Sequence, residues 1–280
     1  MHIKISKWST FGNTKVNHYY IINMLQAEKI KENWERYRGL VNTMFPTRKD
    51  ALNRMYDELE ERMVFMPASS MEHFHNAFAG GYVDHILRVM DCALTLHNTW
   101  TVTGADMSGY TEEELLFAAM HHDLGKAGFP GEGNEVYQIE TSDWHRKNQG
   151  KLYKTNSNIP FAMVPDLSLW LLQEYDVKVS WNEYQAIKIH DGMYDDANKP
   201  YFVARSAQAK LKTNLPVLLH HADHMASIIE YERWRNYKAG TPKPVVEKSK
   251  ATKSNGLKNL AENNPDVEKS LTDIFKAFND

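Results

Sequence analysis

The sequence has little of what a secreted or membrane protein needs. A single cysteine, Cys92, occurs among the 280 residues, so a disulfide framework within one chain is excluded and a reducing compartment is expected. No apolar run approaches the roughly 20 residues that span a bilayer, and residues 1–15 contain no apolar segment typical of a secretory signal. We therefore expect a cytoplasmic protein with no membrane partner.

Positive charge is not in excess either. The chain has 33 lysines and arginines against 36 aspartates and glutamates, which gives a net charge of −3 at pH 7. Proteins that coat long nucleic acids usually have a strongly basic face, so this class is disfavoured. A nucleotide or a short single strand stays compatible, because a bound metal ion can supply positive charge. The hydrophobic content of 42% is typical of a globular chain with a sizeable core.

Apolar residues recur mostly at helical spacing, which predicts an all-α fold. Gly39 is expected to end the first helix. Two later helices begin with capping boxes, in which Thr111 pairs with Glu114 and Ser180 pairs with Glu183. The helices are expected over residues 20–40, 48–64, 81–99, 111–123, 166–175, 180–190 and 215–237, with a short one near 265–278.

One segment departs from this helical pattern. Residues 127–160 begin with three glycines around Pro130. Two short stretches with β-type residues follow, and the segment predicts a small loop or β-hairpin insertion. Residues 239–256 are polar and rich in lysine, which is typical of a linker. The expected organisation is an N-terminal helical extension (1–64), the main helical domain (65–238), this linker (239–256) and a C-terminal short helix (257–280).

The pair His122-Asp123 ends an apolar helical segment, and Gly125 allows the chain to bend there. Adjacent imidazole and carboxylate groups can bind one divalent ion. His85 and Asp223 lie in two other apolar segments, where an unpaired imidazole or charge would be costly to bury. The alternative is a polar core whose groups satisfy one another, but one metal ion explains all four residues. Mixed nitrogen and oxygen ligands suit Mn, Fe, Co, Ni, Zn or Mg.

Two further histidines would extend the pattern to a second ion. His190 ends a helix, with Asp191 beside it, and His145 lies in the 127–160 segment. With both, six ligands would hold two ions, a clamp suited to in-line attack on phosphorus. The alternatives are a His190 that is favoured at a helix C-terminus by the dipole, and a His145 that is exposed or touches substrate. Of the two, we favour His190 as a ligand.

Several residues near these positions are candidates for binding substrate. Lys126 follows the His-Asp pair and is expected to contact phosphate or stabilise the transition state, with a solvated lysine at a helix end as the alternative. Arg146 and Lys147 lie beside Trp144, where they would bind phosphates while the ring stacks a base, unless the segment is an ordinary wet hairpin. His75 precedes the Gly-Gly pair and is expected to line the cleft.

These residues resemble the HD-domain superfamily of metal-dependent phosphohydrolases. The most specific part, FMPASSMEHFHNAFAGGYVDHILRV, is similar to the entry segment of the HD-type 3′→5′ exoribonucleases. The positions that match, in order, are Pro67, Ala68, His75, Ala77, Phe78, Gly80, Gly81, Asp84 and His85. The resemblance covers about residues 65–235.

The resemblance implies an HD-domain helical bundle with one ion, or two in dinuclear members. It implies that the first ion is held by His85, His122, Asp123 and Asp223, with Lys126 near the phosphate. The chain departs from the exoribonucleases in two ways. No β-rich OB-type segment precedes residue 65, and His190-Asp191 stands where paired histidines are usual.

The expected function is therefore hydrolysis of phosphate esters of nucleotides, or of a nucleic-acid 3′ end, by a metal-activated water that Asp123 orients or deprotonates. An alternative is a metal-bearing module that senses a nucleotide without turnover. A third is a metal that only clamps the helices together. The amphipathic helices at 20–40 and 48–64 would cover the core or form a homo-oligomer interface.

Overall fold

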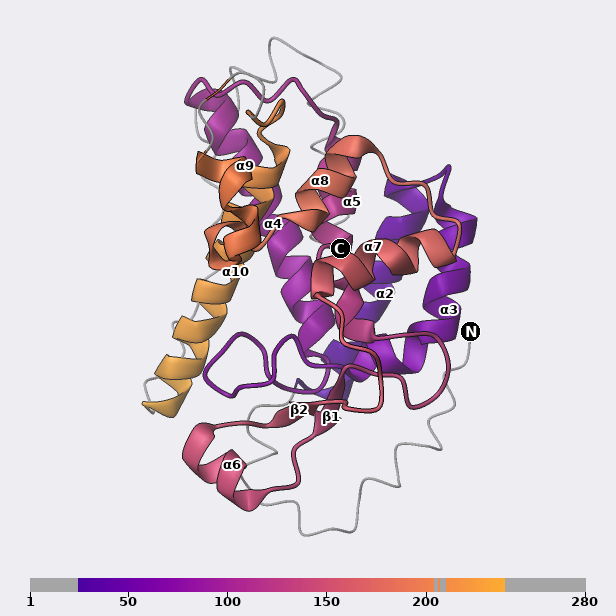
Figure 1. Ribbon diagram of the computed structural model, residues 1–280, viewed down its shortest axis with the longest axis vertical. Helices are drawn as coiled ribbons and strands as arrows, with labels where there is room; N and C mark the ends of the chain where they lie inside the picture. The colour runs from indigo at the N-terminus through magenta and orange to yellow at the C-terminus, as the bar shows by residue number, and fades with distance from the viewer. Residues whose placement is uncertain (1–24, 204–205, 207–209, 240–280) are drawn as a thin grey trace.

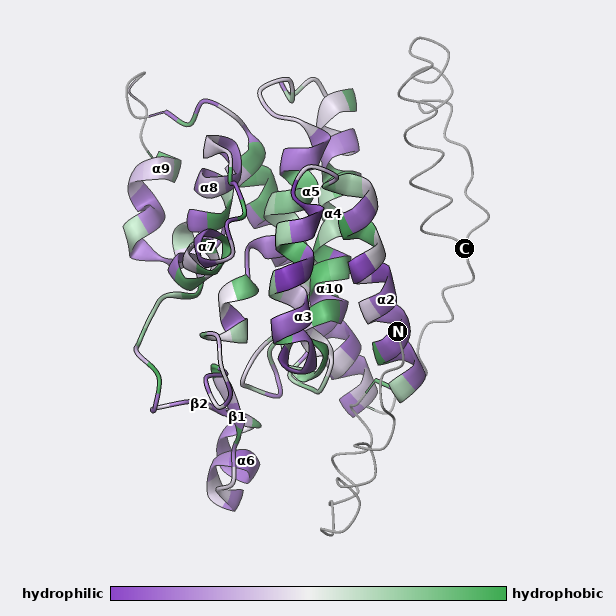
Figure 2. Ribbon diagram, turned by 90° about the vertical axis from the view of Figure 1, so that its right-hand side faces the viewer, coloured by the Kyte–Doolittle hydropathy of each residue, from purple (hydrophilic) through white to green (hydrophobic). Residues whose placement is uncertain are grey.

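Three helices form the centre of the fold, and the four expected metal ligands lie on them or just after their ends. The computed structural model describes residues 25–203, 206 and 210–239. Helix α4 (Gly81–Val102) packs along α10 (Leu215–Lys238) and against α5 (Glu112–His121), as Figure 1 shows. Most of the hydrophobic residues of α4 and α5 belong to the core, and Figure 2 shows green, hydrophobic stretches on both helices. The expected all-α fold is confirmed.

Helices α2 (Ala27–Met44) and α3 (Lys49–Phe65) pack together and cover α4. Three of their aromatic residues are buried and in contact: the ring of Tyr37 lies with its centroid 5.5 Å from that of Trp34 and 5.3 Å from that of Tyr56. These residues belong to the same hydrophobic core as those of α4, α5 and α10. The proposed boundary between an extension and a main domain near residue 65 stays a prediction.

The first helix does not end at Gly39 as expected. Helix α2 continues to Met44, and Val41 is fully buried on it. Glycine in a helix interior costs about 1 kcal/mol relative to alanine. Burial of a valine side chain contributes about 1.5–3 kcal/mol, so packing outweighs the local propensity.

Both predicted capping boxes are present. The N–H of Glu114 donates to the Thr111 hydroxyl at 3.1 Å, and the N–H of Thr111 donates to the Glu114 carboxylate at 2.9 Å. Ser180 makes the same exchange with Glu183 at the start of α8 (Trp181–Lys188). Helix α7 (Val164–Glu174) precedes α8. The short elements η3 (Gly192–Tyr194), η4 (Asp196–Asn198) and α9 (Lys199–Val203) follow it.

The insertion is a hairpin, as predicted, but a helix was missed within it. Strands β1 (Tyr137–Ile139) and β2 (Tyr153–Thr155) are antiparallel, with Gln138 opposite Lys154. Between them lies α6 (Asp143–Gln149), capped by the Ser142 hydroxyl and ended by Gly150 at a φ of 64°. A serine N-cap followed by a glycine C-cap is a local helix signal. Figures 1 and 2 place α6 at the end of the hairpin that points away from the bundle.

Two further expectations concern membrane-spanning helices and the C-terminal part of the chain. No helix in the described ranges is both long and apolar enough to cross a membrane. The predicted linker, apart from Ala239 at the end of α10, and the predicted C-terminal helix lie outside the described residues.

Candidate metal centre

The His-Asp pair lies at a sharp turn that α7 holds in place. Helix α5 ends at His121, and η2 (Leu124–Ala127) begins after Asp123. The N–H of Gly125 donates to the Ser168 hydroxyl at 2.7 Å, and this hydroxyl lies 3.0 Å from the carbonyl oxygen of His122. A Cβ on Gly125 would lie 2.2 Å from the carbonyl oxygen of Val164. Glycine is therefore required here for close packing against α7, and Ser168 fixes the turn that carries the pair.

The four expected ligands of the first ion meet, although they come from three elements. The Nε2 atom of His85 lies 3.1 Å from Asp223 Oδ1 and 3.8 Å from Asp123 Oδ2. The Nε2 atom of His122 lies 3.6 Å from Asp123 Oδ2 and 3.8 Å from Asp223 Oδ1. Atoms bound to one ion at about 2.1 Å would lie roughly 3.0 to 3.4 Å from each other. Small side-chain adjustments would therefore bring these four atoms around one ion.

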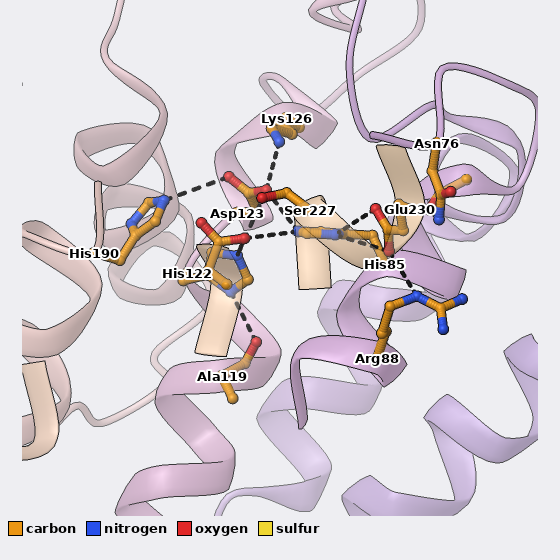
Figure 3. A network of polar contacts seen from close by, with 12 residues as sticks. Asn76, His85, Arg88, Ala119, His122, Asp123, Lys126, His190, Ser227 and Glu230 are labelled. Carbon is orange, nitrogen blue, oxygen red and sulfur yellow. Dashed lines mark hydrogen bonds and ion pairs between the residues drawn. The ribbon is translucent and has the colours of Figure 1, made fainter. Parts of the chain in front are cut away.

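His190 reaches the same carboxylate from the other side. Its Nε2 atom lies 3.7 Å from Asp123 Oδ1, so the two oxygens of Asp123 face different histidines. In Figure 3 the rings of His85, His122 and His190 are gathered around Asp123, with Lys126 beside it. The ligand atoms of His190, His122 and Asp123 all lie within 4.8 Å of one another. This group shares His122 and Asp123 with the first set, so His190 is a further candidate ligand of the same centre.

The three histidines share one hydrogen-bonding pattern. The Nδ1 of His85 donates to Glu230 at 3.1 Å, and the Nδ1 atoms of His122 and His190 donate to the carbonyls of Ala119 at 2.9 Å and Ile187 at 2.8 Å. Because a carbonyl oxygen can only accept, the proton of a neutral ring is on Nδ1 and the lone pair is on Nε2. Metal-binding histidines usually have this pattern.

Two of these Nε2 atoms are buried without a hydrogen-bond partner among the described residues, those of His85 and His122. The short distance from His85 to Asp223 does not have hydrogen-bond geometry. Burying an unsatisfied polar atom costs about 1–3 kcal/mol, so such atoms need an explanation. A cation bound between them would satisfy both, and the buried His and Asp groups could therefore hold a metal ion.

Charges in the cluster shift the pKa values of its members strongly. Burial alone would raise the pKa of Asp123, but Lys126 and the neighbouring histidines hold it well below its usual range. Burial opposes protonation of His85, yet Glu230 and Asp223 raise its pKa to about 10. Burial lowers the pKa of His122 to about 4. The carboxylates of Asp123 and Asp223 therefore stay ionised, and both are available to bind a cation.

His190 and Lys126 respond to the same carboxylate. Burial opposes protonation of His190, but Asp123 and Asp191 raise its pKa to about 9. Lys126 is buried and forms an ion pair with Asp123, which raises the lysine pKa above its usual value despite the burial. Lys126 is thus a buried cation at the centre of the site, and the solvated lysine that was the alternative interpretation is wrong.

Glu230 and Arg88 belong to the site but were missed in the sequence. Glu230 is 3% exposed and accepts from both His85 and the Nε of Arg88, the latter at 2.9 Å. Arg88 also donates to Asp84 at 2.9 Å. Glu230 follows Asp223 by seven residues, two helical turns, so it lies on the same face of α10. This spacing is the signal that would have identified it.

Of the remaining candidate residues, one lies at the cluster and three lie on the hairpin. The ring of His75 stacks on that of His85, and its ligand atom groups with those of His85 and Asp123. His145 lies on α6, where its Nδ1 is 3.5 Å from Glu140 Oε2, and it belongs to none of the candidate metal groups in the described ranges. The reason is that α6 forms the tip of the hairpin. Arg146 and Lys147 lie on the same helix, and Lys147 is 3.9 Å from Asp143.

Comparisons of this chain with protein-family models, with curated proteins and with solved structures find no match.

Proposed function

We propose that the protein is a metal-dependent phosphohydrolase that cleaves phosphate esters of nucleotides or of a nucleic-acid 3′ end. The observation that supports this most is the shared pattern of His85, His122 and His190. Each ring donates from Nδ1 to an acceptor and turns Nε2 toward the carboxylate of Asp123. The resemblance to HD-domain phosphohydrolases supports the reaction class.

The residues divide between holding the ion and handling the substrate. His85, His122, Asp123 and Asp223 would hold the first ion, and Asp123 with His190 would contribute to a second. A divalent ion bound there would lower the pKa of a bound water or polarise a phosphate oxygen. The donor set suits Mn, Fe, Co, Ni, Zn or Mg.

Lys126 and Asp123 then act on the reacting groups. The buried ammonium group of Lys126 supplies a fixed positive charge beside Asp123, where it favours phosphoryl oxygens that gain negative charge in the transition state. The carboxylate of Asp123 stays ionised, so it can orient the attacking water as an acceptor. The substrate is a nucleotide or a short single strand, whose phosphates carry the charge that this arrangement favours.

The test is product analysis after incubation with mixed ribonucleotides and deoxynucleotides and with a short single-stranded oligonucleotide. Mn-loaded wild-type protein is compared with His122→Ala and with His221→Ala. His221 is a control on α10 that is exposed and contacts Trp100. We expect conversion by the wild type and the control, and loss of both metal and activity in His122→Ala.

The products separate the substrate classes. Conversion of free nucleotides indicates a nucleotidase, whereas stepwise shortening of the oligonucleotide indicates an exonuclease. Absence of conversion by fully metallated protein contradicts the proposal. A nucleotide recovered unhydrolysed from purified protein would then support the sensor instead.

A further inference from the structure

His75 lies in the loop between α3 and α4, and packing holds this loop in place. The carbonyl oxygen of the next residue, Asn76, accepts from the N–H of Ala68 at 3.1 Å, and its side-chain amide donates to Asp84 at 2.9 Å. Asn76 has a φ of 44°, and a Cβ on Gly81 would lie 2.0 Å from its carbonyl oxygen. The loop approaches α4 this closely because residue 81 is glycine. The position of His75 is therefore determined by the fold.

The imidazole of His75 faces the metal centre. Its ring stacks on that of His85, with centroids 4.7 Å apart and planes 30° from parallel. A ring nitrogen of His75 and ligand atoms of His85 and Asp123 all lie within 4.8 Å of one another. Within the described residues, the His75 ring takes part in no hydrogen bond or ion pair. A nitrogen lone pair is therefore available at the edge of the cluster.

The hydrogen bond of His85 determines which ion His75 would reach. The Nδ1 of His85 donates to Glu230, so only Nε2 remains for a metal, and a single lone pair binds a single ion. His85 also forms a group with His122 and Asp223. A ligand that shares an ion with His85 therefore shares it with His122 and Asp223 as well.

We propose that His75 is a fifth protein ligand of the ion that His85 binds. This inference rests on the proposed metal centre and assigns His75 to the metal instead of the substrate. With His85, His122, Asp123 and Asp223, the ion has five protein ligands. An octahedral ion then keeps one open position, which is enough for a water or a phosphate oxygen. A four-ligand centre would keep two.

Metal titration of the apo protein tests this proposal. Mn²⁺ binding is measured by calorimetry for the wild type, His75→Ala, His85→Ala and His73→Ala. His73 is the matched control, because it belongs to the same loop but makes an edge-to-face contact with Phe74 and belongs to none of the candidate groups in the described residues. We expect the tightest site to weaken at least tenfold in His75→Ala and by less than twofold in His73→Ala.

Two further measurements separate a ligand from a residue that only supports the loop. Free imidazole added to His75→Ala should restore part of the lost affinity, because it can occupy the vacated position. The Co²⁺-loaded wild type and His75→Ala should differ in their visible absorption, which reports coordination number and geometry. No difference in spectrum or affinity, while His85→Ala still loses the metal, overturns the role of His75 and leaves the proposed function intact. A wild type that binds no divalent ion overturns both.

Discussion

Replacement of Glu230 by glutamine tests the chain of contacts that orients His85. The glutamate carboxylate accepts from His85 Nδ1 at 3.1 Å and from Arg88 Nε at 2.9 Å, and it is almost fully buried. Glutamine keeps the shape but loses the negative charge, and its amide nitrogen replaces one of the two acceptor oxygens by a donor. The hydrogen bond from His85 Nδ1 is then weaker, so the tautomer that has its proton on Nδ1 and leaves Nε2 free is less favoured.

The size of the effect follows from similar contacts at other metal sites. Loss of a group that hydrogen-bonds a metal-binding histidine weakens metal affinity by about 10- to 100-fold, or roughly 1.4 to 2.7 kcal/mol. Arg88 keeps its pair with Asp84, so the fold should survive. Calorimetric titration of the apo variant with Mn²⁺ measures the change. Glu232→Gln is the control, because residue 232 is exposed on the same helix.

Equal Mn²⁺ affinity of Glu230→Gln and wild type would refute this reasoning. Thermal unfolding of both apo proteins is needed beside the titration, because a variant that is largely unfolded would also bind weakly. A folded Glu230→Gln variant with unchanged affinity would mean that the Glu230 contact only stabilises the packing of α10 on α4.

Three further outcomes are expected. Ser168→Ala leaves the buried N–H of Gly125 without its acceptor, so chemical denaturation should show a loss of about 1–3 kcal/mol, and no loss would mean that Ser168 does not hold the turn. Metal affinity, measured by titration, should rise from about pH 6 to pH 9. The pKa values of His85 and His190 are raised to about 10 and 9, and their protons must leave before the ion binds. An affinity that falls as the pH rises would contradict this expectation. Saturation with metal at 100 times its Kd should stabilise the fold by about 2.7 kcal/mol, seen as a higher Tm that a chelator reverses.

Patterns confined to neighbouring residues were predictable from the sequence. The capping boxes at Thr111 and Ser180 depend on groups three residues apart, and both form as expected. The hairpin in residues 127–160 was also recognisable, although α6 within it was missed despite Ser142 and Gly150 at its ends. The predicted end of the first helix was wrong, because Val41 packs into the core beyond Gly39. The free energy gained by burying Val41 depends on its packing against distant helices, which the local sequence does not show.

By itself, the sequence determined the helical class and the donor types of the site, because spacing along one helix decides which side chains share a face. Only the tertiary structure decided which donors meet. His190 and His75 lie 67 and 48 residues from Asp123 in the chain. The packing of α8 on α5 and of α4 on α5 brings both to its carboxylate. Packing likewise places Glu230 behind His85 and leaves His145 at the tip of the hairpin. Contacts between distant segments depend on how the helices pack, and the periodicity of residues along one segment does not determine that packing.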